Sequence, residues 1–135
     1  MKSNGDGDLR DHVRKMALLT KKDEPEYNQI RNELVKVLEK MGGYEPAIDD
    51  MHIDQIARTA VYTKKVEAYL DSELATVDTY VRVTDIKLKQ SKIINEAFQQ
   101  LAIARRDRIG KQTESSLMIE LREAMLRGLK ANAEQ

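Results

Sequence analysis

The sequence contains no cysteine and no tryptophan, and it has only two prolines and one phenylalanine among its 135 residues. The absence of cysteine excludes disulfide bonds, thiolate zinc sites, iron–sulfur clusters and cysteine nucleophiles, and it is typical of a reducing compartment. No apolar run approaches the ~20 residues that a membrane helix needs, and the polar start lacks the apolar segment of a signal peptide. We therefore expect a cytoplasmic chain that does not enter a membrane.

The charged residues are numerous but balanced, with 23 Lys+Arg against 23 Asp+Glu. Together with 41% hydrophobic residues, this balance excludes a disordered chain of low hydrophobicity and high net charge. A chain of this length can bury roughly two-thirds of the surface that its unfolded form exposes. The composition therefore predicts one folded domain with one core.

Glycine and proline occupy few positions, and the stretches between them have the apolar periodicity of helices. From Tyr27 to Met41 the apolar residues recur mainly at steps of three and four, and Gly42-Gly43 ends that helix. Asp23 is expected to cap the helix, because an aspartate side chain accepts hydrogen bonds from the first free amides. Helices are expected over residues 9–22, 23–41, 49–74, 91–108 and 113–129.

Residues 76–84 differ from their surroundings, since β-branched and aromatic residues cluster there. That cluster predicts a short extended or hairpin-like insert. The fold class is therefore expected to be all-α, a helical bundle around a long antiparallel helix pair. The chain divides into a disordered N-terminus (1–8), an N-terminal helical region that is a candidate for DNA binding (9–44), a central helical hairpin as oligomerisation core (45–111), and a C-terminal helix and tail (112–135).

Side chains that carry catalysis or hold metals are sparse. The two histidines, His12 and His52, lie in different expected helices and have no ligand spacing. The densest carboxylate group is Asp49, Asp50 and Asp54, and a helix would put the last two on one face, a geometry that a magnesium site could use. Capping and the helix dipole explain these acids more simply. We expect no catalytic residue, no metal site and no cofactor.

Charge is segregated along the chain. Residues 49–85 contain four basic and eight acidic side chains, whereas residues 86–111 contain seven basic and two acidic ones. The basic groups lie at the two ends of one expected helix, roughly 20 Å apart, so a monomer offers no compact cationic patch. Copies around an axis would form a cationic band able to meet duplex phosphates, while the alternative is a solvated basic face offset by the acidic segment. The candidate DNA contacts in this segment are Lys87, Lys89, Lys92, Arg105, Arg106, Arg108 and Lys111.

The helices expected at 49–74 and 91–108 have apolar surfaces broader than one stripe. Such width indicates packing on more than one neighbour, either inside the protomer or across an oligomer interface. We expect identical copies to cover part of these surfaces. The candidate interface residues are Ile53, Ile56, Ala60, Leu70, Ile94, Phe98 and Leu101.

The order of elements follows a familiar pattern over residues 27–108. A Gly-Gly-Tyr-x-Pro turn at 42–46 leads to a helix that opens on the acidic pair Asp49-Asp50. After the insert comes Lys-x-Lys-Gln-Ser-Lys-Ile-Ile-Asn-Glu-Ala-Phe-Gln-Gln-Leu, ending at Leu101, and then a basic helix end. This arrangement resembles the small-subunit family of tailed-phage terminases.

The resemblance implies a non-enzymatic packaging factor that forms a ring, recognises double-stranded viral DNA in the infected cell and presents it to an ATP-hydrolysing large subunit. It also implies that residues 49–74 and 91–108 build the ring, and that residues 117–129 bind the motor or add to the assembly. The family's DNA contacts are commonly N-terminal. Here the corresponding candidates are Arg10, Arg14, Lys15, Lys21 and Lys22.

Two other functions stay open at this point. The broad apolar surfaces also suit a helical adaptor or regulator that acts only through protein contacts. The carboxylates at Asp49, Asp50 and Asp54 are the single feature that favours a metal-dependent hydrolase.

Overall fold

The computed structural model describes residues 14–71 and 76–133. Within them the chain forms α2 (Glu24–Lys40), α3 (Pro46–Leu70), α4 (Val77–Ala104), α5 (Arg106–Ile109), the 3₁₀ turn η1 (Lys111–Thr113) and α6 (Glu114–Ala133). A short helical turn at 14–17 precedes α2. These ranges contain no strand, so the expected all-α helical bundle is confirmed.

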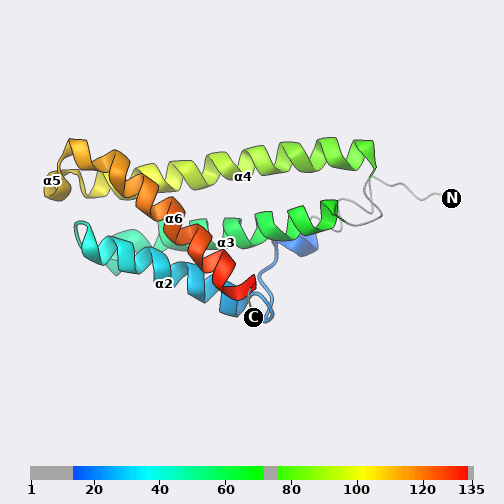
Figure 1. Cartoon of the computed structure of the whole chain (residues 1–135), viewed down its shortest axis with the longest axis horizontal. Helices are drawn as coiled ribbons and strands as arrows, with labels where there is room; N and C mark the ends of the chain where they lie inside the picture. Colours follow the sequence, from blue (N-terminus) through cyan, green and yellow to red (C-terminus); the bar gives the residue numbers. More distant parts are fainter. Residues whose placement is uncertain (1–13, 72–75, 134–135) are drawn as a thin grey trace.

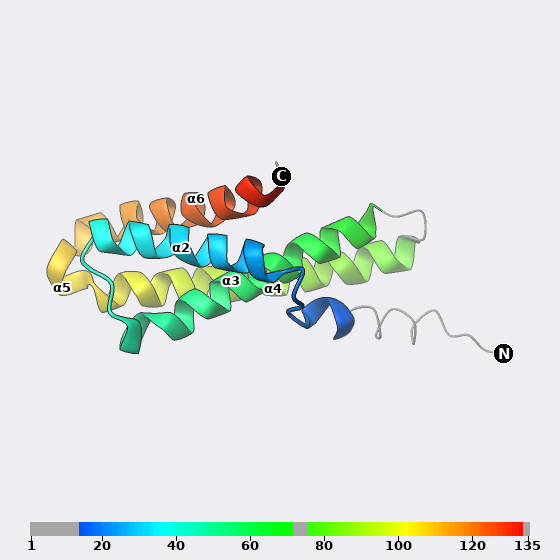
Figure 2. The ribbon, with the colours of Figure 1, turned by 90° about the horizontal axis from the view of Figure 1, so that it is seen from below.

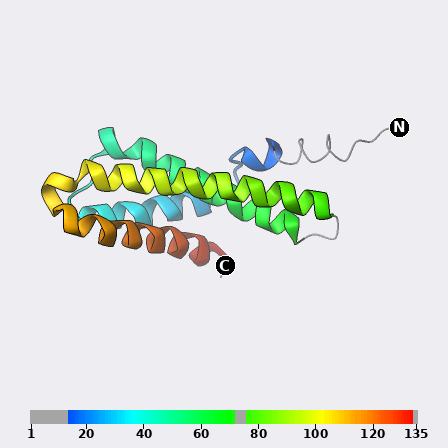
Figure 3. The same ribbon diagram turned by 90° about the horizontal axis from the view of Figure 1, so that it is seen from above.

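The two longest helices, α3 and α4, form an antiparallel pair, and α2 and α6 lie beside one half of it (Figure 1). Figures 2 and 3 show the other half of the pair extending past the ends of α2 and α6. We call the four-helix part the body; it comprises α2, α6 and residues 46–65 and 90–104. The projecting part, residues 66–70 and 77–89, is the arm.

The expected extended insert at 76–84 is wrong, because α4 begins at Val77 and runs without a break to Ala104. Thr76 caps it, its hydroxyl accepting a hydrogen bond from the amide of Thr79 at 3.1 Å. A preference of β-branched residues for strands depends on a neighbouring strand to pair with, and the described residues offer none. Val83 is instead fully buried on a helix.

The predicted cap of α2 is also wrong. The Asp23 side chain makes no capping bond at the start of α2. Its carboxylate turns back and accepts hydrogen bonds from the amide and the hydroxyl of Thr20, at 2.9 and 3.0 Å. This is the return half of a capping box, in which a side chain three residues into a turn bonds the backbone at its start.

The core lies in the body, where one face of each long helix meets the others. α2 packs most extensively on α6, and α3 on α4. The largest fully buried apolar side chains of this core are Ile30, Leu34, Leu38, Ile53, Ile56, Phe98, Leu101, Leu117 and Leu121.

Gly128 allows α6 to approach α2 closely. A Cβ atom at this position would lie 2.6 Å from the Cα of Ile30, which is backbone and cannot rotate away. The glycine therefore interrupts the helical pattern of α6 for a packing reason.

We predict that Gly128→Ala lowers the free energy of unfolding by about 1–3 kcal/mol, because the added methyl group forces α2 and α6 apart. Alanine's higher helix propensity, worth about 1 kcal/mol, would otherwise make this substitution stabilising. Urea denaturation measures the difference, with Ser116→Ala on the exposed face of α6 as the control. A variant more stable than the natural chain would contradict the close contact.

Candidate functional site: the buried clamp, the cations and the exposed seam

A buried ion pair joins the start of α3 to the end of α4. Arg105 donates a hydrogen bond from Nη2 to Asp49 Oδ2, and the two side chains are only 1% and 2% exposed. The same carboxylate accepts a hydrogen bond from the Glu45 amide at 2.7 Å, which closes the first turn of α3. Asp49 therefore has a structural role.

The turn between α2 and α3 is held by the same cationic end of α4 and α5. Arg105 Nε donates to the Gly43 carbonyl at 2.9 Å, and Arg108 Nη1 donates to the Gly42 carbonyl at 2.6 Å. Both glycines have positive φ angles, 100° and 93°, which residues with a side chain rarely adopt. A Cβ on Gly42 would also lie 3.0 Å from Ile109. We call Asp49, Arg105, Arg108 and these two carbonyl groups the clamp.

The other two aspartates of the acidic group are paired as well. Asp50 accepts a hydrogen bond from the Tyr44 hydroxyl and lies 3.2 Å from Arg31 Nη2. The Tyr44 pKa is raised, first by this hydrogen bond and then by burial. Asp50 is therefore paired with a cation, as Asp49 is.

Asp54 completes these polar contacts between α2 and α3. It accepts a hydrogen bond from Tyr27 and pairs with Arg58 at 3.0 Å. Burial, together with the hydrogen bond to Asp54, raises the pKa of Tyr27 to about 12. Among the described residues, no group of three or more His, Cys, Asp or Glu side chains is arranged to hold a metal ion.

The structure separates the described basic candidates into three groups: one buried, four ion-paired, and the others exposed without an ion pair. Arg105 is buried in the clamp and offers no surface to DNA, so its expected role as a DNA contact is wrong. Four others have carboxylate partners: Lys87 with Glu67, Lys89 with Asp85, Arg106 with Glu114, and Arg108 with Glu45. Arg10 and the side chain of Lys111 lie outside the described residues.

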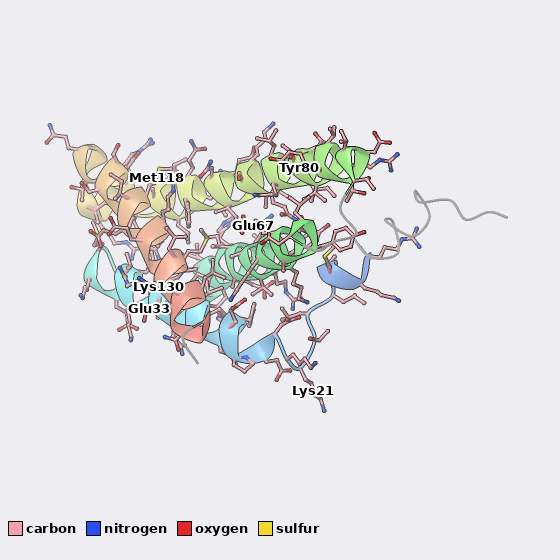
Figure 4. All side chains as sticks on the ribbon, turned by 45° about the vertical axis from the view of Figure 1, so that its right-hand side comes forward. Lys21, Glu33, Glu67, Tyr80, Met118 and Lys130 are labelled. Carbon is pink, nitrogen blue, oxygen red and sulfur yellow. The ribbon has the colours of Figure 1, made fainter. Side chains whose placement is uncertain are left out.

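The remaining basic candidates are exposed and make no ion pair within residues 14–71 and 76–133. One of them, Lys92, lies on α4, and Figure 4 shows Lys21 projecting away from the helices. Four of the five belong to the segment that precedes α2. The complete set is Arg14, Lys15, Lys21, Lys22 and Lys92.

The segment that carries these four cations is fastened to α3 by Lys65. The Lys65 ammonium group bonds the Asp23 carboxylate and the Leu18 carbonyl, the latter at 3.0 Å. Burial alone would raise the pKa of Asp23, but the hydrogen bonds from Lys65 and Thr20 outweigh it and lower that pKa. Lys65 therefore fixes the position of the segment that carries the exposed cations.

The candidate interface residues are used inside the single chain. Six of them, all except Leu70, belong to the hydrophobic core of the body, and Leu70 is half-buried in the arm. These residues therefore supply no exposed face, because α2 and α6 cover α3 and α4 within one protomer. The broad apolar surface was correctly recognised in the sequence, but what covers it is the protomer itself.

A different apolar stripe is exposed on the arm. Val77, Val81, Thr84 and Leu88 follow steps of four, three and four along α4, which places them on one face of the helix. The three apolar members are 81%, 61% and 66% exposed. We call these four residues the seam. Interpreting residues 76–84 as an insert hid this spacing, although it can be read from the sequence once the segment is taken as helix.

Comparison with known proteins finds no matching family model, curated protein or solved structure. No relative therefore contributes to the functional conclusions below, which rest on the geometry and on the sequence pattern of residues 27–108. No helix in the described part of the chain is long and apolar enough to cross a membrane.

We predict that Arg105→Met lowers the free energy of unfolding by about 3–5 kcal/mol, because it leaves the Asp49 carboxylate buried without its cation. Thermal or urea unfolding followed by circular dichroism measures the loss.

Arg106→Met is the matched control, since it removes a neighbouring guanidinium group whose ion pair with Glu114 lies at the surface. Its unfolding midpoint should stay close to that of the natural chain. Equal losses in the two variants would show that burial of the Arg105 pair does not matter.

Proposed function

We propose that this chain is a non-enzymatic DNA-packaging factor, a terminase small subunit that binds double-stranded DNA as a homo-oligomer and presents it to the large-subunit motor in an infected cell. The observation that carries the proposal is the arm: a two-helix projection with an exposed apolar seam, next to a segment of cations that make no ion pair with any described residue. The resemblance of residues 27–108 to the terminase small-subunit family supports the same function.

The seam supports self-assembly. Single exposed apolar residues are normal on any protein surface, but here three of them lie at heptad spacing along one face of α4, with Thr84 between Val81 and Leu88. A second copy that covers Val77, Val81 and Leu88 would remove this strip from water. Association would thereby stabilise the assembly, at roughly 25 cal/mol for each Å² of apolar surface buried.

The cations of residues 14–22 support DNA binding. Ion-paired side chains must give up a carboxylate before they can contact a phosphate, whereas these four are free of that competition within the described residues. A single copy offers only a few such contacts. Several copies would place several sets along one duplex, and the affinity would increase with the number of phosphates neutralised.

The large subunit needs its own contact surface, and α6 offers one. Its inner face packs on α2, while Ile119 and Leu126, seven residues apart, are exposed on its outer face. Both lie within residues 117–129, the segment that the family resemblance assigns to the motor or to assembly.

We predict that Leu88→Lys reduces self-association at least tenfold, because it places a charge in the seam. Light scattering over a range of concentrations measures the size of the natural chain and of the variant. Met51→Lys is the control, since it also places a charge on an exposed apolar residue, but on α3 in the body. A natural chain that stays monomeric at high concentration would rule out assembly through the seam.

We predict that Lys21→Ala combined with Lys22→Ala weakens duplex binding and lowers the dependence of log Kd on log salt by about two units. Fluorescence anisotropy with a labelled duplex at several salt concentrations measures both effects. Lys40→Ala combined with Lys130→Ala removes the same charge elsewhere on the surface and serves as the control. If the chain does not bind the duplex at low salt, the packaging proposal fails.

The second candidate function is an adaptor that acts only through protein contacts, and the seam is the observation that favours it. The two functions differ in their response to salt. Phosphate neutralisation predicts binding that weakens steeply as salt increases, whereas apolar docking predicts little change. A chain that self-associates through the seam but does not bind DNA would be the adaptor.

A further inference from the structure

A buried polar layer lies between α3 and α4 where the arm joins the body. The Thr63 hydroxyl of α3 lies within hydrogen-bond distance of two acceptors, Gln90 Oε1 of α4 at 2.6 Å and the Thr59 carbonyl at 2.8 Å, and its single proton is donated to one of them at a time. Gln90 is only 4% exposed. Its Nε2 atom is buried and has no hydrogen-bond partner among the described residues.

This layer divides the apolar interior of the molecule. On the body side, the continuous core ends with Val61 on α3 and Ile94 on α4. On the arm side, Val66 and Val83 are fully buried, yet they lie outside that core. The main core thus stops at the polar layer.

The helices that cover the body, α2 and α6, end close to the polar layer. Residues at the start of α2 pair with the last third of α3, Asp23 with Lys65 and Glu26 with Lys64. Figures 1 and 2 show that neither α2 nor α6 continues along the arm. Beyond the polar layer, therefore, neither α2 nor α6 covers α3 and α4.

A buried amide donor without a partner destabilises the folded state, because it has lost its hydrogen bonds to water. The arm also has little buried apolar surface to offset this loss. Proteins open locally in cooperative units, and the least stable units are those with few buried contacts. The polar layer and the two-helix packing together make the arm such a unit.

We propose that the arm is a conformational unit that opens independently of the body, with the Thr63–Gln90 layer as its hinge. Gln90 holds the register of the hairpin through Thr63, since a slip of one turn would move its amide among apolar side chains. It also weakens the attachment of the arm. The proposal goes beyond the packaging function and does not require the chain to bind DNA.

Hydrogen exchange measured by mass spectrometry on the full chain tests this proposal. Amides of residues 66–70 and 78–88 should exchange together, with protection at least tenfold lower than that of residues 53–61 and 94–102. Gln90→Leu should raise protection in the arm about tenfold, because it removes the unpaired amide group. Protection in the body should change by less than twofold.

Gln99→Leu is the matched control, since it makes the same chemical change on an exposed face of α4 within the body. It should leave the arm unchanged. All measurements are made on dilute chain shown to be monomeric by light scattering, or in the Leu88→Lys background. The result is then independent of self-assembly, and failure of the hinge is distinguishable from failure of the packaging function.

Thr63→Val gives a second test should Gln90→Leu not fold. It removes the only described partner of the Gln90 amide, so arm protection should fall several-fold while body protection is retained. The proposal is overturned if the natural arm exchanges at the rate of the body. It is equally overturned if Gln90→Leu fails to protect the arm or if Thr63→Val loosens arm and body together.

Discussion

The buried ion pair between Asp49 and Arg105 is the interaction on which the arrangement of the helices depends. Taking both charges out of water is unfavourable unless each finds all its partners, and here the guanidinium group also bonds the Gly43 and Leu101 carbonyls. The clamp therefore fixes four segments at once: the pair and the carbonyl groups hold the turn after α2, the start of α3 and the end of α4, and Arg108 adds α5.

The clamp lies at one end of the molecule, and the two halves differ in how many helices pack together. Near the clamp, four helices share a continuous core, and the close α2–α6 contact at Gly128 completes it. Away from the clamp, α3 and α4 continue as a pair with a polar layer at its base and the seam on its surface. The stable half positions the helices, while the features suited to association lie on the less covered half and on the segment that Lys65 fastens to the adjoining end of the body.

Much of the fold could be predicted because helix periodicity and glycine position are local properties. The helix ending at Gly42-Gly43 and the long antiparallel pair follow from apolar spacing. The site could be predicted less well. Arg105 and Arg106 are adjacent and chemically identical, yet one is buried and the other exposed. Residues 76–84 were misjudged because β-branched residues favour strands only where a sheet exists.

The sequence by itself determined a helical chain without cysteine chemistry, with apolar faces too broad for a single contact. Only the tertiary structure decided that α2 and α6 cover those faces, and that the exposed stripe lies instead at Val77, Val81 and Leu88. The physical reason is that helix periodicity shows which residues share a face, whereas burial depends on segments far apart in the chain. Which carboxylate meets which cation depends on the same distant packing.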